Sequence, residues 1–494
     1  MPWAIKNPRS LYIDAQWIKP QNAILEPIIN PANEELIGEA PVGGQPEVEA
    51  AGASARRAFD KGPWVRMRPQ ERAALLQKFH GALMRRAAEI CQLIIAEAGA
   101  PVMLAQFLQF GIPMKHLQFY IDASVRDPVT PLPIDLTPNA QGGKTLGAGV
   151  MVREPQGVVA GISAYNFPFF LNLAKVGPAL AAGNTLVLKP SPYTPFEALI
   201  LGEAADEAGL PPGVLNIVTG GADVGELLTR DPRIDMVSFT GSDTVGAAIM
   251  AQAAPTLKRV HLELGGKSAL IVRQDANLQQ AAETGLGGFT VQCGQGCALL
   301  TRHLVHNSVR AKYVDLLSSM VRHVKLGDPS DPSVGMGPLI REGARKRVEN
   351  YVEVGKQEVA RLVTGGRRPE QLKKGFYYEP TLFNDVDNRS RLAQEEIFGP
   401  VGVVIGFDTD EEAIALANDS KFGLSGGIFS ADVGRAYEMA LELRTGGVLI
   451  NGGGGTMSSY APFGGYKRSG IGREYGIEGL NEFTQIKHIS FHGA

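Results

Sequence analysis

A cysteine and a glutamate, each placed among glycines, are the residues of this chain best suited to do chemistry. Cys297 ends the run Gly294-Gln295-Gly296-Cys297, and Glu263 lies 34 positions earlier in Leu262-Glu263-Leu264-Gly265-Gly266. A thiolate is a nucleophile and a carboxylate can take a proton from water, so the pair suits a reaction that passes its substrate through a thioester. Glycine lets backbone and ligand come close at both places.

Each of these residues alone would be ordinary. A free cysteine is more often a small buried hydrophobe than a nucleophile, and most glutamates are solvated surface charges. The context of Glu263 differs, because Val260 to Leu264 is typical of a strand end and a Gly-Gly pair follows. A carboxyl between two leucines at that point is expected to be partly desolvated, which raises its pKa toward that of a usable base.

Composition limits the classes of protein to consider. The chain of 494 residues is long enough for two or three domains, and its net charge of -3 predicts neither nucleic-acid binding nor attraction to an anionic membrane. The chain has only three cysteines, which makes a disulfide framework improbable. Cys293 and Cys297 have no histidine near them in the sequence that could complete a zinc site, so no metal is expected. The N-terminus lacks a secretory signal and no apolar run reaches about 18 residues, so a cytoplasmic protein is expected.

The elements that must position the reactive residues follow an α/β pattern. Residues 46–110 are mostly helical and are interpreted as a packing layer. From there on, short apolar runs at 157–162, 184–189, 214–218 and 236–240 alternate with helical stretches at 171–182, 196–209 and 223–230. Buried strands alternating with helices predict a parallel sheet with crossovers, and therefore a doubly wound α/β domain.

A second α/β block follows Glu263. Its predicted strands are 269–272, 303–305, 401–406 and 447–450, with helices at 309–324 and 411–418. Two further strand-like pieces, 144–152 and 482–491, belong to neither block. Long strands outside the main sheets often pair with a neighbouring subunit.

Three features after the predicted strands of the first block could hold a ligand. The turn Thr240-Gly241-Ser242 leads into a helix, where free N–H groups favour a phosphate, although such turns are common. Lys189 ends a strand and can reach a ribose or a phosphate, or else it is a surface lysine. Asn166 can donate to a developing oxyanion, while in isolation a turn asparagine would be the better interpretation.

Seven motifs in order resemble those of the aldehyde dehydrogenase superfamily, over residues from about 20 to 490. They are Ala164-Tyr165-Asn166-Phe167-Pro168, Lys189-Pro190-Ser191, Phe239-Thr240-Gly241-Ser242, Leu262-Glu263-Leu264-Gly265-Gly266-Lys267, Gly294-Gln295-Gly296-Cys297, Glu395-Glu396-Ile397-Phe398-Gly399-Pro400 and Pro462-Phe463-Gly464-Gly465-Tyr466-Lys467.

This resemblance implies a role for each matching residue. Cys297 is expected to be the nucleophile, Glu263 the general base, Asn166 with the Cys297 N–H the oxyanion site, and Lys175 a lysine that relays protons to the base. NAD is the expected cofactor, with Lys189 and Glu396 at its riboses, Phe398 at the nicotinamide and Ser242 at the pyrophosphate. The other expected cofactor contacts are Ile162, Ser163, Ser191, Gly221, Gly241 and Leu264, and the expected substrate pocket comprises Phe167, Phe170, Leu171, Ala174 and Phe463.

The resemblance also implies an architecture. A Rossmann-like cofactor domain is expected over 1–130 and 153–262, a catalytic domain over 263–470, and a small bridging sheet over 131–152 and 471–494 that builds a homodimer or homotetramer.

The chain departs from the family pattern at three places. Ala164 and Tyr165 replace the usual Pro-Trp ahead of Asn166. Pro192 stands where NAD-preferring members carry a glutamate that binds the adenosine ribose and repels a 2′-phosphate, so NADP is a possible cofactor. The loop 452–456 is unusually rich in glycine, where the family places part of the substrate pocket.

The leading hypothesis is an NAD(P)-dependent aldehyde dehydrogenase that releases a free acid. The apolar Phe170, Leu171 and Ala174 predict a hydrophobic substrate, an aromatic or medium-chain aldehyde. One alternative is a CoA-acylating semialdehyde dehydrogenase, against which Glu263 argues, because CoA-dependent relatives generally lack that base. Another is a catalytically silent structural member of the fold, against which intact Cys297, Glu263 and Asn166 argue together.

Overall fold

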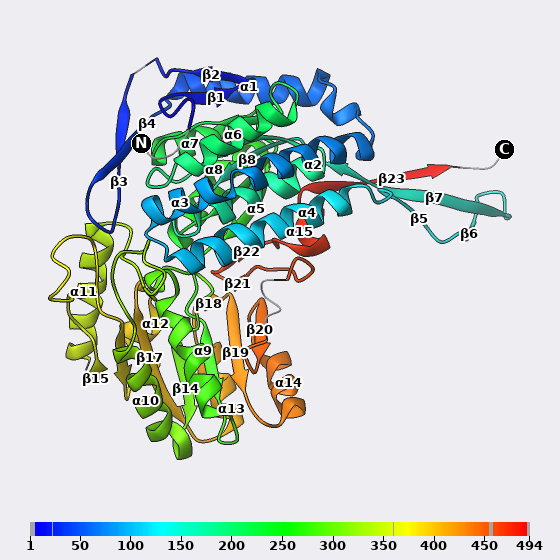
Figure 1. The fold of residues 1–494 in the computed structure, drawn as a ribbon. Coiled ribbons are helices and arrows are strands. Elements are labelled where there is room, and N and C mark those ends of the chain that lie inside the picture. The colour runs from blue at the N-terminus through cyan, green and yellow to red at the C-terminus, as the bar shows by residue number, and fades with distance from the viewer. Residues whose placement is uncertain (1–4, 22, 359, 454–457, 492–494) are drawn as a thin grey trace.

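Two sheets covered by helices form the body of the molecule, and a third sheet projects from it (Figure 1). The computed structural model describes residues 5–21, 23–358, 360–453 and 458–491. No helix in this part of the chain has the length and apolar character that a membrane crossing requires.

The first sheet has the doubly wound topology expected from its apolar strands. Its order is β2 (Gln16–Ile18), β1 (Leu11–Ile13), β10 (Leu215–Ile217), β9 (Thr185–Lys189), β8 (Val158–Ile162), β11 (Met236–Thr240), β12 (Arg259–Glu263), β22 (Gly470–Ile471). The five strands from β10 to β12 are parallel. Among these parallel strands β8 comes first in the chain. The chain then winds outward through β9 and β10 and returns to β11 on the other side of β8, so the carboxyl ends of β8 and β11 flank the switch point where ligands bind in such sheets.

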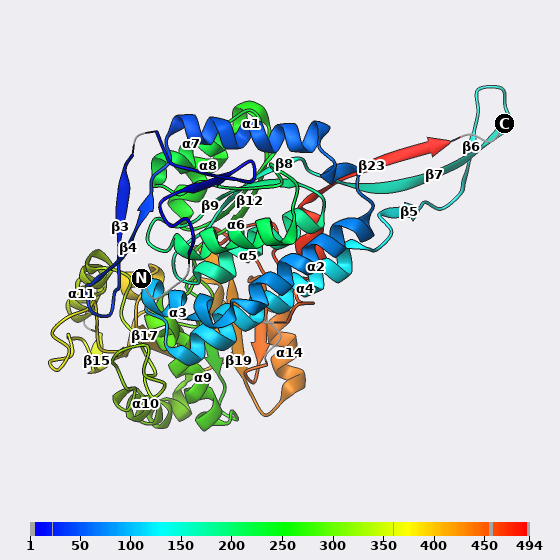
Figure 2. The same ribbon diagram turned by 45° about the horizontal axis from the view of Figure 1, so that its top comes forward.

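Helices cover both faces of this sheet because its strands are apolar on both sides. On one face α5 (Pro168–Ala181) and α6 (Phe196–Ala208) pack over Val159 and Leu186. On the other, α1 (Gln45–Lys61), α7 (Ala222–Arg230) and α8 (Asp243–Ala253) pack over Val158 and Val187 (Figure 2). An outer layer packs on the first face; it comprises α2 (Pro69–Arg85), α3 (Ala87–Ala98), the π-helix Leu104–Gly111 and α4 (Ile112–Ser124), preceded by a short 3₁₀ turn at Trp64–Arg66. Another 3₁₀ turn, Ala254–Thr256, extends α8.

The second sheet is parallel except at one edge. Its order is β15 (Arg361–Thr364), β16 (Thr381–Asn384), β17 (Val401–Phe407), β14 (Arg302–His306), β13 (Ala269–Val272), β19 (Ser425–Phe429), β20 (Gly447–Ile450), and only β15 is antiparallel to its neighbour. Its helices are α9 (Leu278–Thr290), α10 (Asn307–Arg322), α11 (Glu342–Gln357), α12 (Arg391–Gln394), α13 (Asp410–Asn418) and α14 (Val433–Glu442). The sequence analysis had identified β13, β14, β17 and β20 but not β16 or β19.

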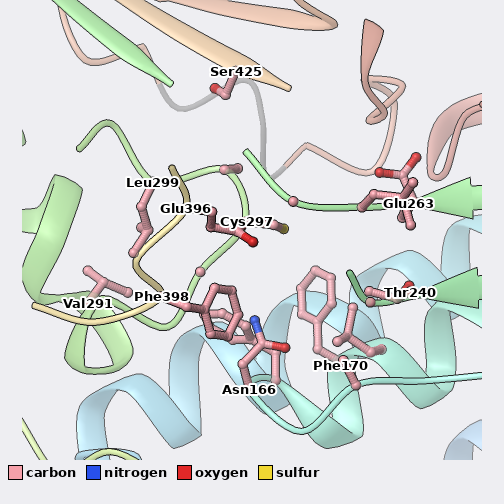
Figure 3. A pocket seen from close by; sticks show the side chains of 18 of the residues that line it. Asn166, Phe170, Thr240, Glu263, Val291, Cys297, Leu299, Glu396, Phe398 and Ser425 are labelled. Carbon is pink, nitrogen blue, oxygen red and sulfur yellow. The ribbon is translucent and has the colours of Figure 1, made fainter. Parts of the chain in front are cut away.

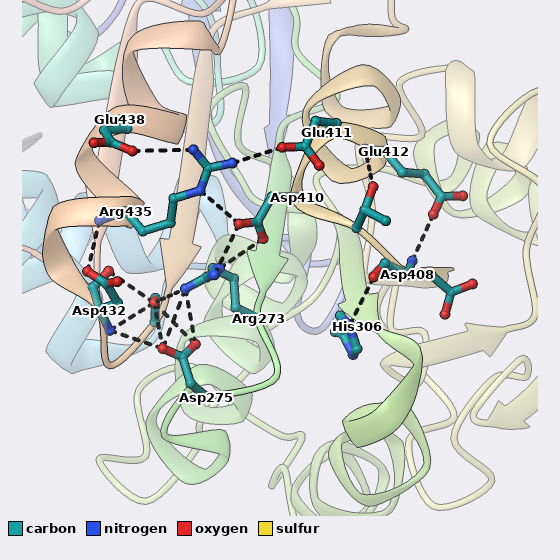
Figure 4. A network of polar contacts seen from close by, with 12 residues as sticks. Arg273, Asp275, His306, Asp408, Asp410, Glu411, Glu412, Asp432, Arg435 and Glu438 are labelled. Atoms are coloured by element: carbon teal, nitrogen blue, oxygen red, sulfur yellow. Dashed lines mark hydrogen bonds and ion pairs between the residues drawn. The ribbon is translucent and has the colours of Figure 1, made fainter.

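A partly buried network of charges ties α13 and α14 to the end of β13 (Figure 4). Arg273, which follows β13, donates from Nε to Asp410 Oδ1 at 2.9 Å, and Arg435 of α14 donates from Nε to Asp410 Oδ2 at 2.9 Å. Asp410 begins α13, where a carboxylate is also favoured by the helix dipole. The network lies away from Cys297 in sequence and serves the packing of the second sheet.

The third sheet forms an arm that extends away from the body (Figure 1). Its strands β23 (Thr484–Phe491), β7 (Lys144–Pro155) and β5 (Val129–Pro131) are antiparallel, and β6 (Asp135–Pro138) also pairs with β7. The tail strand and the strand-like excursion of the sequence analysis are thus hydrogen-bonded to each other. Residues 470–483 do not belong to the arm, because β22 lies at the edge of the first sheet and α15 (Gly476–Glu482) packs on α4 and α5.

Two small ladders complete the fold. They are the hairpin β3 (Leu25–Ile29) with β4 (Leu36–Pro41), and the pair β18 (Phe422–Gly423) with β21 (Tyr466–Lys467).

Candidate active site

A cavity of about 740 Å³ lies at the carboxyl ends of the strands of the first sheet, with residues of the second sheet's domain opposite. A cavity of this size suits a small-molecule ligand. Several residues predicted from the sequence line it: Cys297, Glu263, Asn166, Gly241, Ser242, Leu264, Glu396, Phe398, Phe167, Phe170, Leu171 and Phe463. The fold therefore gathers motifs from most of the chain around one space.

Cys297, Glu263 and Asn166 surround the same part of this cavity (Figure 3). Glu263 is the last residue of β12, Asn166 lies in the loop between β8 and α5, and Cys297 lies in the loop between α9 and β14. Cys297 is partly exposed, whereas Cys293, four residues earlier, is buried. Only Cys297 is therefore open to a ligand that enters the cavity.

The Glu263 carboxyl is buried, and both of its oxygens are available to a ligand. Neither of its oxygens has a hydrogen-bond partner among the described residues, and the ring of His261 is 3.8 Å away, measured from Nε2 to Oε1. Burial, and then the neighbouring Glu474 carboxylate, raise the pKa of Glu263 well above its ordinary value. Burial lowers the pKa of His261, so the imidazole is neutral near pH 7. Glu263 is therefore free to hold a water molecule and basic enough to take a proton from it.

The surroundings of Cys297 favour the protonated form of its thiol. Burial, followed by the nearby carboxyls of Glu263, Glu396 and Glu474, raises its pKa to about 12. The site therefore does not store a thiolate, and the thiol must lose its proton when a substrate is attacked. Glu263 is a nearby carboxyl that can accept this proton.

Asn166 offers one of its two amide hydrogens to the cavity. Its Nδ2 donates to the Gln295 carbonyl at 2.8 Å, which uses the other hydrogen. The backbone N–H of Cys297 lies on the same loop as that carbonyl. Together they can stabilise negative charge on an oxygen atom at this end of the cavity.

The loop before Cys297 has a strained backbone. Gln292, Cys293 and Gly294 are successive residues with positive φ, at 50°, 55° and 72°. A residue other than glycine in this region costs about 1–3 kcal/mol, and such strain persists only where surrounding contacts fix it. The loop is thus held in one conformation by its neighbours.

Lys175 does not line the cavity but contacts it through a partner that the sequence analysis did not identify. Its Nζ donates to Glu474 Oε1 at 2.5 Å, with both side chains almost fully buried. Glu474 lines the cavity and follows β22. The pair is a buried polar connection from α5 to the neighbourhood of Glu263.

The cavity also has the features of a nucleotide site. Thr240 ends β11, and Ser242 precedes α8, where its Oγ caps the helix by accepting from Val245 N at 3.3 Å. Thr240 Oγ1 is buried and has no partner in the described part of the chain, so it is available to a ligand. Glu396 Oε1 accepts from Gly266 N at 2.9 Å, and a Cβ on Gly265 would lie 2.5 Å from Glu396 Oε2. A side chain at 265 would therefore displace this carboxylate from its present position.

The remaining predicted cofactor residues lie at the same edge of the first sheet, outside the cavity. Ile162 and Lys189 end β8 and β9, Ser163 and Ser191 follow them, and Gly221 precedes α7. Ala174 is likewise buried behind the cavity, in a cluster with Phe170 and Leu171. Residues 454–457 of the glycine-rich loop lie outside the described residues.

Two arginines that the sequence analysis did not single out line the cavity. Arg347 donates from Nε to the Ile397 carbonyl at 3.0 Å. The guanidinium carbon of Arg341 lies 4.8 Å from the centre of the Tyr193 ring. Both therefore lie against the segments that carry Glu396 and Lys189. The lining near Phe170 is aromatic instead, since the Phe170 ring contacts that of Tyr475 edge-on at 5.6 Å.

Comparison with known proteins identifies close relatives over the whole chain. The model of the aldehyde dehydrogenase family matches residues 17–489. A 3-succinoylsemialdehyde-pyridine dehydrogenase of a Pseudomonas species is 41% identical over 97% of this chain and 98% of its own length. Geranial dehydrogenase of Castellaniella defragrans is 38% identical, with 98% of each chain covered.

Solved structures have the same fold. Betaine aldehyde dehydrogenase of Staphylococcus aureus in complex with NAD⁺ is 35% identical and superposes with a TM-score of 0.94 over 98% of this chain and 95% of that one. A mutant of aldehyde dehydrogenase C of Pseudomonas syringae, in complex with NAD⁺ and octanal, is 37% identical with a TM-score of 0.91, covering 98% and 96% of the two chains. These matches confirm the fold class inferred from the sequence.

Proposed function

Because the chain belongs to the aldehyde dehydrogenase family, we propose that it oxidises an aldehyde to the free carboxylic acid through a thioester on Cys297. The protein is an NAD(P)-dependent aldehyde dehydrogenase, as its family and the NAD⁺ complexes of its relatives establish. The observation that carries the finer proposal is the uncommitted carboxyl of Glu263, which shares one cavity with a partly exposed Cys297.

The first half of the reaction forms a bond to sulfur. The Cys297 Sγ adds to the carbonyl carbon as its thiol proton is taken up by a base, and the carbonyl oxygen becomes an oxyanion. Asn166 Nδ2 and the Cys297 N–H donate hydrogen bonds to that oxygen. Bound NAD(P) supplies the acceptor for the hydride that leaves this carbon, so that a thioester remains on Cys297.

The second half releases the acid. Glu263 removes a proton from a water molecule, whose oxygen adds to the thioester carbon. The carbon–sulfur bond then breaks with its electron pair on sulfur, and the thiolate takes up a proton from solvent to restore the Cys297 thiol. Lys175 and Glu474, as a buried ion pair beside Glu263, provide a route for the proton that Glu263 removes. In this proposal CoA takes no part, because Glu263 provides the hydrolytic base.

NAD(P) is assigned to the side of the cavity that carries Thr240 and Ser242. Glu396 would hold one ribose and Lys189 the other, with Phe398 beside the nicotinamide. The proposed contacts also include Ile162, Ser163, Ser191, Gly221, Gly241 and Leu264. The unpaired Thr240 hydroxyl and the helix N-terminus at Ser242 support this placement.

The substrate class proposed is a hydrophobic aldehyde, aromatic or of medium chain length. Support comes from the apolar side chains that line the cavity near Cys297, including Phe170, Leu171, Phe463 and Tyr475. The relatives named for geranial and for a pyridine semialdehyde, and the octanal complex, are consistent with such a substrate.

An aldehyde panel tests the reaction and the substrate class together. Purified protein with NAD⁺ should reduce the cofactor with octanal and benzaldehyde faster than with succinic semialdehyde, without CoA, and should release the free acid. Product that forms only with CoA, as an acyl-CoA, would favour the acylating alternative. A panel in which charged aldehydes are the best substrates would overturn the substrate class.

Cofactor preference gives a second prediction. Pro192 leaves no carboxylate at the position that usually repels a 2′-phosphate, so activity with both NAD and NADP is expected. Burial lowers the pKa of Lys189 to about 8, and the nearby Asp223 opposes that shift. Pro192→Glu should move the ratio of kcat/KM values toward NAD by about 1–3 kcal/mol, roughly one to two decades.

Measuring kcat/KM for both cofactors in the wild type and in Pro192→Glu decides this. Asp223→Asn is the matched variant, because it removes a carboxylate that already lies close to Lys189 in the wild type. A wild type already strict for NAD, unchanged by Pro192→Glu but relaxed by Asp223→Asn, would assign the preference to Asp223 instead.

We also propose a homodimer or homotetramer assembled through the arm. Its strands and their connection expose large apolar side chains, among them Ile134 (69% exposed), Leu136 (56%) and Phe491 (57%), more than a lone surface element favours. The proposed domain division has a cofactor domain over 1–130 and 153–262 and a catalytic domain over 263–470. Of the bridging segments predicted over 131–152 and 471–494, the second contributes to the arm only through Thr484–Phe491. Light scattering on the purified protein measures the mass. The cytoplasmic location stays a prediction.

A further inference from the structure

A closed ring of hydrogen bonds lies behind the nucleophile loop. Its members are Gln109, Asn166, Gln292 and Gln295, and all four are buried. Gln109 Nε2 donates to the Asn166 carbonyl at 3.4 Å and to Gln292 Oε1 at 3.1 Å. Asn166 Nδ2 donates to the Gln295 carbonyl at 2.8 Å, and Gln295 Nε2 donates to the Gln292 carbonyl at 3.0 Å. The ring thus joins three separate segments of the chain.

Gln109 is the member that comes from outside the two catalytic loops. It lies on the π-helix Leu104–Gly111. Leu108, the residue before Gln109 on this helix, lines the cavity. π-helical turns are rare and are often found at functional sites. One turn of this helix therefore contacts the cavity and, one residue later, the ring.

We infer that Gln109 is a positioning residue, which aligns Asn166 and the strained loop before Cys297 for oxyanion stabilisation; the inference rests on the function proposed above. Gln109 binds the backbone of Asn166 and the side chain of Gln292, which is one of the residues with positive φ. The Asn166 amide is oriented by the Gln295 carbonyl, so the direction of its free hydrogen depends on both sides of the ring. Displacing either side turns that hydrogen away from the substrate oxygen.

Packing alone does not account for a glutamine at this position. Gln109 is fully buried, yet its Oε1 has no hydrogen-bond partner among the described residues. A buried acceptor without a partner is unfavourable, and an apolar side chain of similar size would avoid that cost. The donor side of the amide, which makes both ring contacts, is what distinguishes glutamine from methionine here.

Gln109→Met therefore tests the inference, because it keeps the shape and removes the donor. We expect kcat for aldehyde oxidation to fall about 10- to 100-fold, as for small misplacements of a reacting group. The Kd for NAD⁺, the thermal midpoint and the rate of Cys297 alkylation by iodoacetamide should stay close to wild type, since none of them needs an oxyanion. A fall in all of these together would indicate a structural role and overturn the inference.

Two further variants sharpen the result. Gln106→Met changes an exposed glutamine of the same π-helix and should leave kcat unchanged. Gln109→Glu also lacks the amide donor, and it replaces Gln109→Met in every comparison if that variant does not fold. Wild-type kcat in either Gln109 variant would show that the donor is not needed.

A double-mutant cycle separates this inference from the proposed function. If Gln109 acts through Asn166, Gln109→Met should have little further effect in an Asn166→Ala background. Additive losses would overturn the positioning role while leaving the oxyanion assignment intact. An Asn166→Ala enzyme with wild-type kcat would instead remove the oxyanion assignment itself, and with it this inference.

Discussion

Cys297→Ala should abolish aldehyde oxidation, lowering kcat by about 10,000-fold or more, because the bond to sulfur is the step on which the remaining steps depend. Binding of NAD⁺ should be nearly unchanged, since the residues assigned to the cofactor come from other segments. The measurements are steady-state reduction of the cofactor with octanal and a titration of NAD⁺ by fluorescence or calorimetry.

Cys293→Ala is the matched control for this variant. Cys293 lies on the same loop four residues earlier, but its side chain is buried and burial raises its pKa strongly. The control should therefore keep most of the activity. Retained turnover in Cys297→Ala, or alkylation of Cys293 in place of Cys297 by iodoacetamide, would show that the nucleophile has been assigned wrongly.

Much of the fold could be predicted because its central strands are short apolar runs between helical stretches. β8, β9 and β11 are buried along their whole length, so their sequences are short, mostly apolar runs. β19 is an inner strand of the second sheet, between β13 and β20, and yet was missed. Two of its five residues are glycines, and a Cβ on Gly427 would lie 3.0 Å from side-chain atoms of Leu270 and Leu300. Close packing favours glycine there, and glycine weakens the sequence signal of a strand.

The site was predictable where reactive residues lie within motifs, and was not where function depends on contacts between distant segments. Cys297, Glu263 and Asn166 each have neighbours that mark them. Glu474 is the partner of Lys175 across 299 positions, and Gln109 reaches Gln292 across 183. No spacing rule connects such residues, because the pairing is set by how α5 and the π-helix pack against the strand ends.

The protonation state of the nucleophile was also left open by the sequence. Either the site stabilises a thiolate or it removes the proton during attack. Burial of Cys297, and then the nearby carboxyls of Glu263, Glu396 and Glu474, raise its pKa to about 12. A base must therefore act already in the first half of the reaction. Glu263, whose pKa is raised as well, can serve there before it serves in hydrolysis.

Glu263→Gln separates these two duties. If hydrolysis is its main task, the variant should form the thioester and then stall, with steady-state turnover reduced by about 100- to 10,000-fold. Rapid mixing with NAD⁺ and aldehyde should then show a burst of reduced cofactor near one equivalent per active site, followed by very slow release of acid. Loss of the burst together with turnover would show that Glu263 is needed to deprotonate the thiol.

The pH dependence of hydrolysis provides the check on this assignment. A base must be ionised to act, so in the wild type the rate of thioester hydrolysis should rise with pH through the pKa of Glu263, which lies above the ordinary range of a glutamate because the carboxyl is buried. Glutamine cannot ionise, so the variant should lose this rise and keep only the dependence on hydroxide. A variant with the wild-type pH profile would assign the base to another group, and Glu474, the neighbouring carboxyl that lines the cavity, would be the next to substitute.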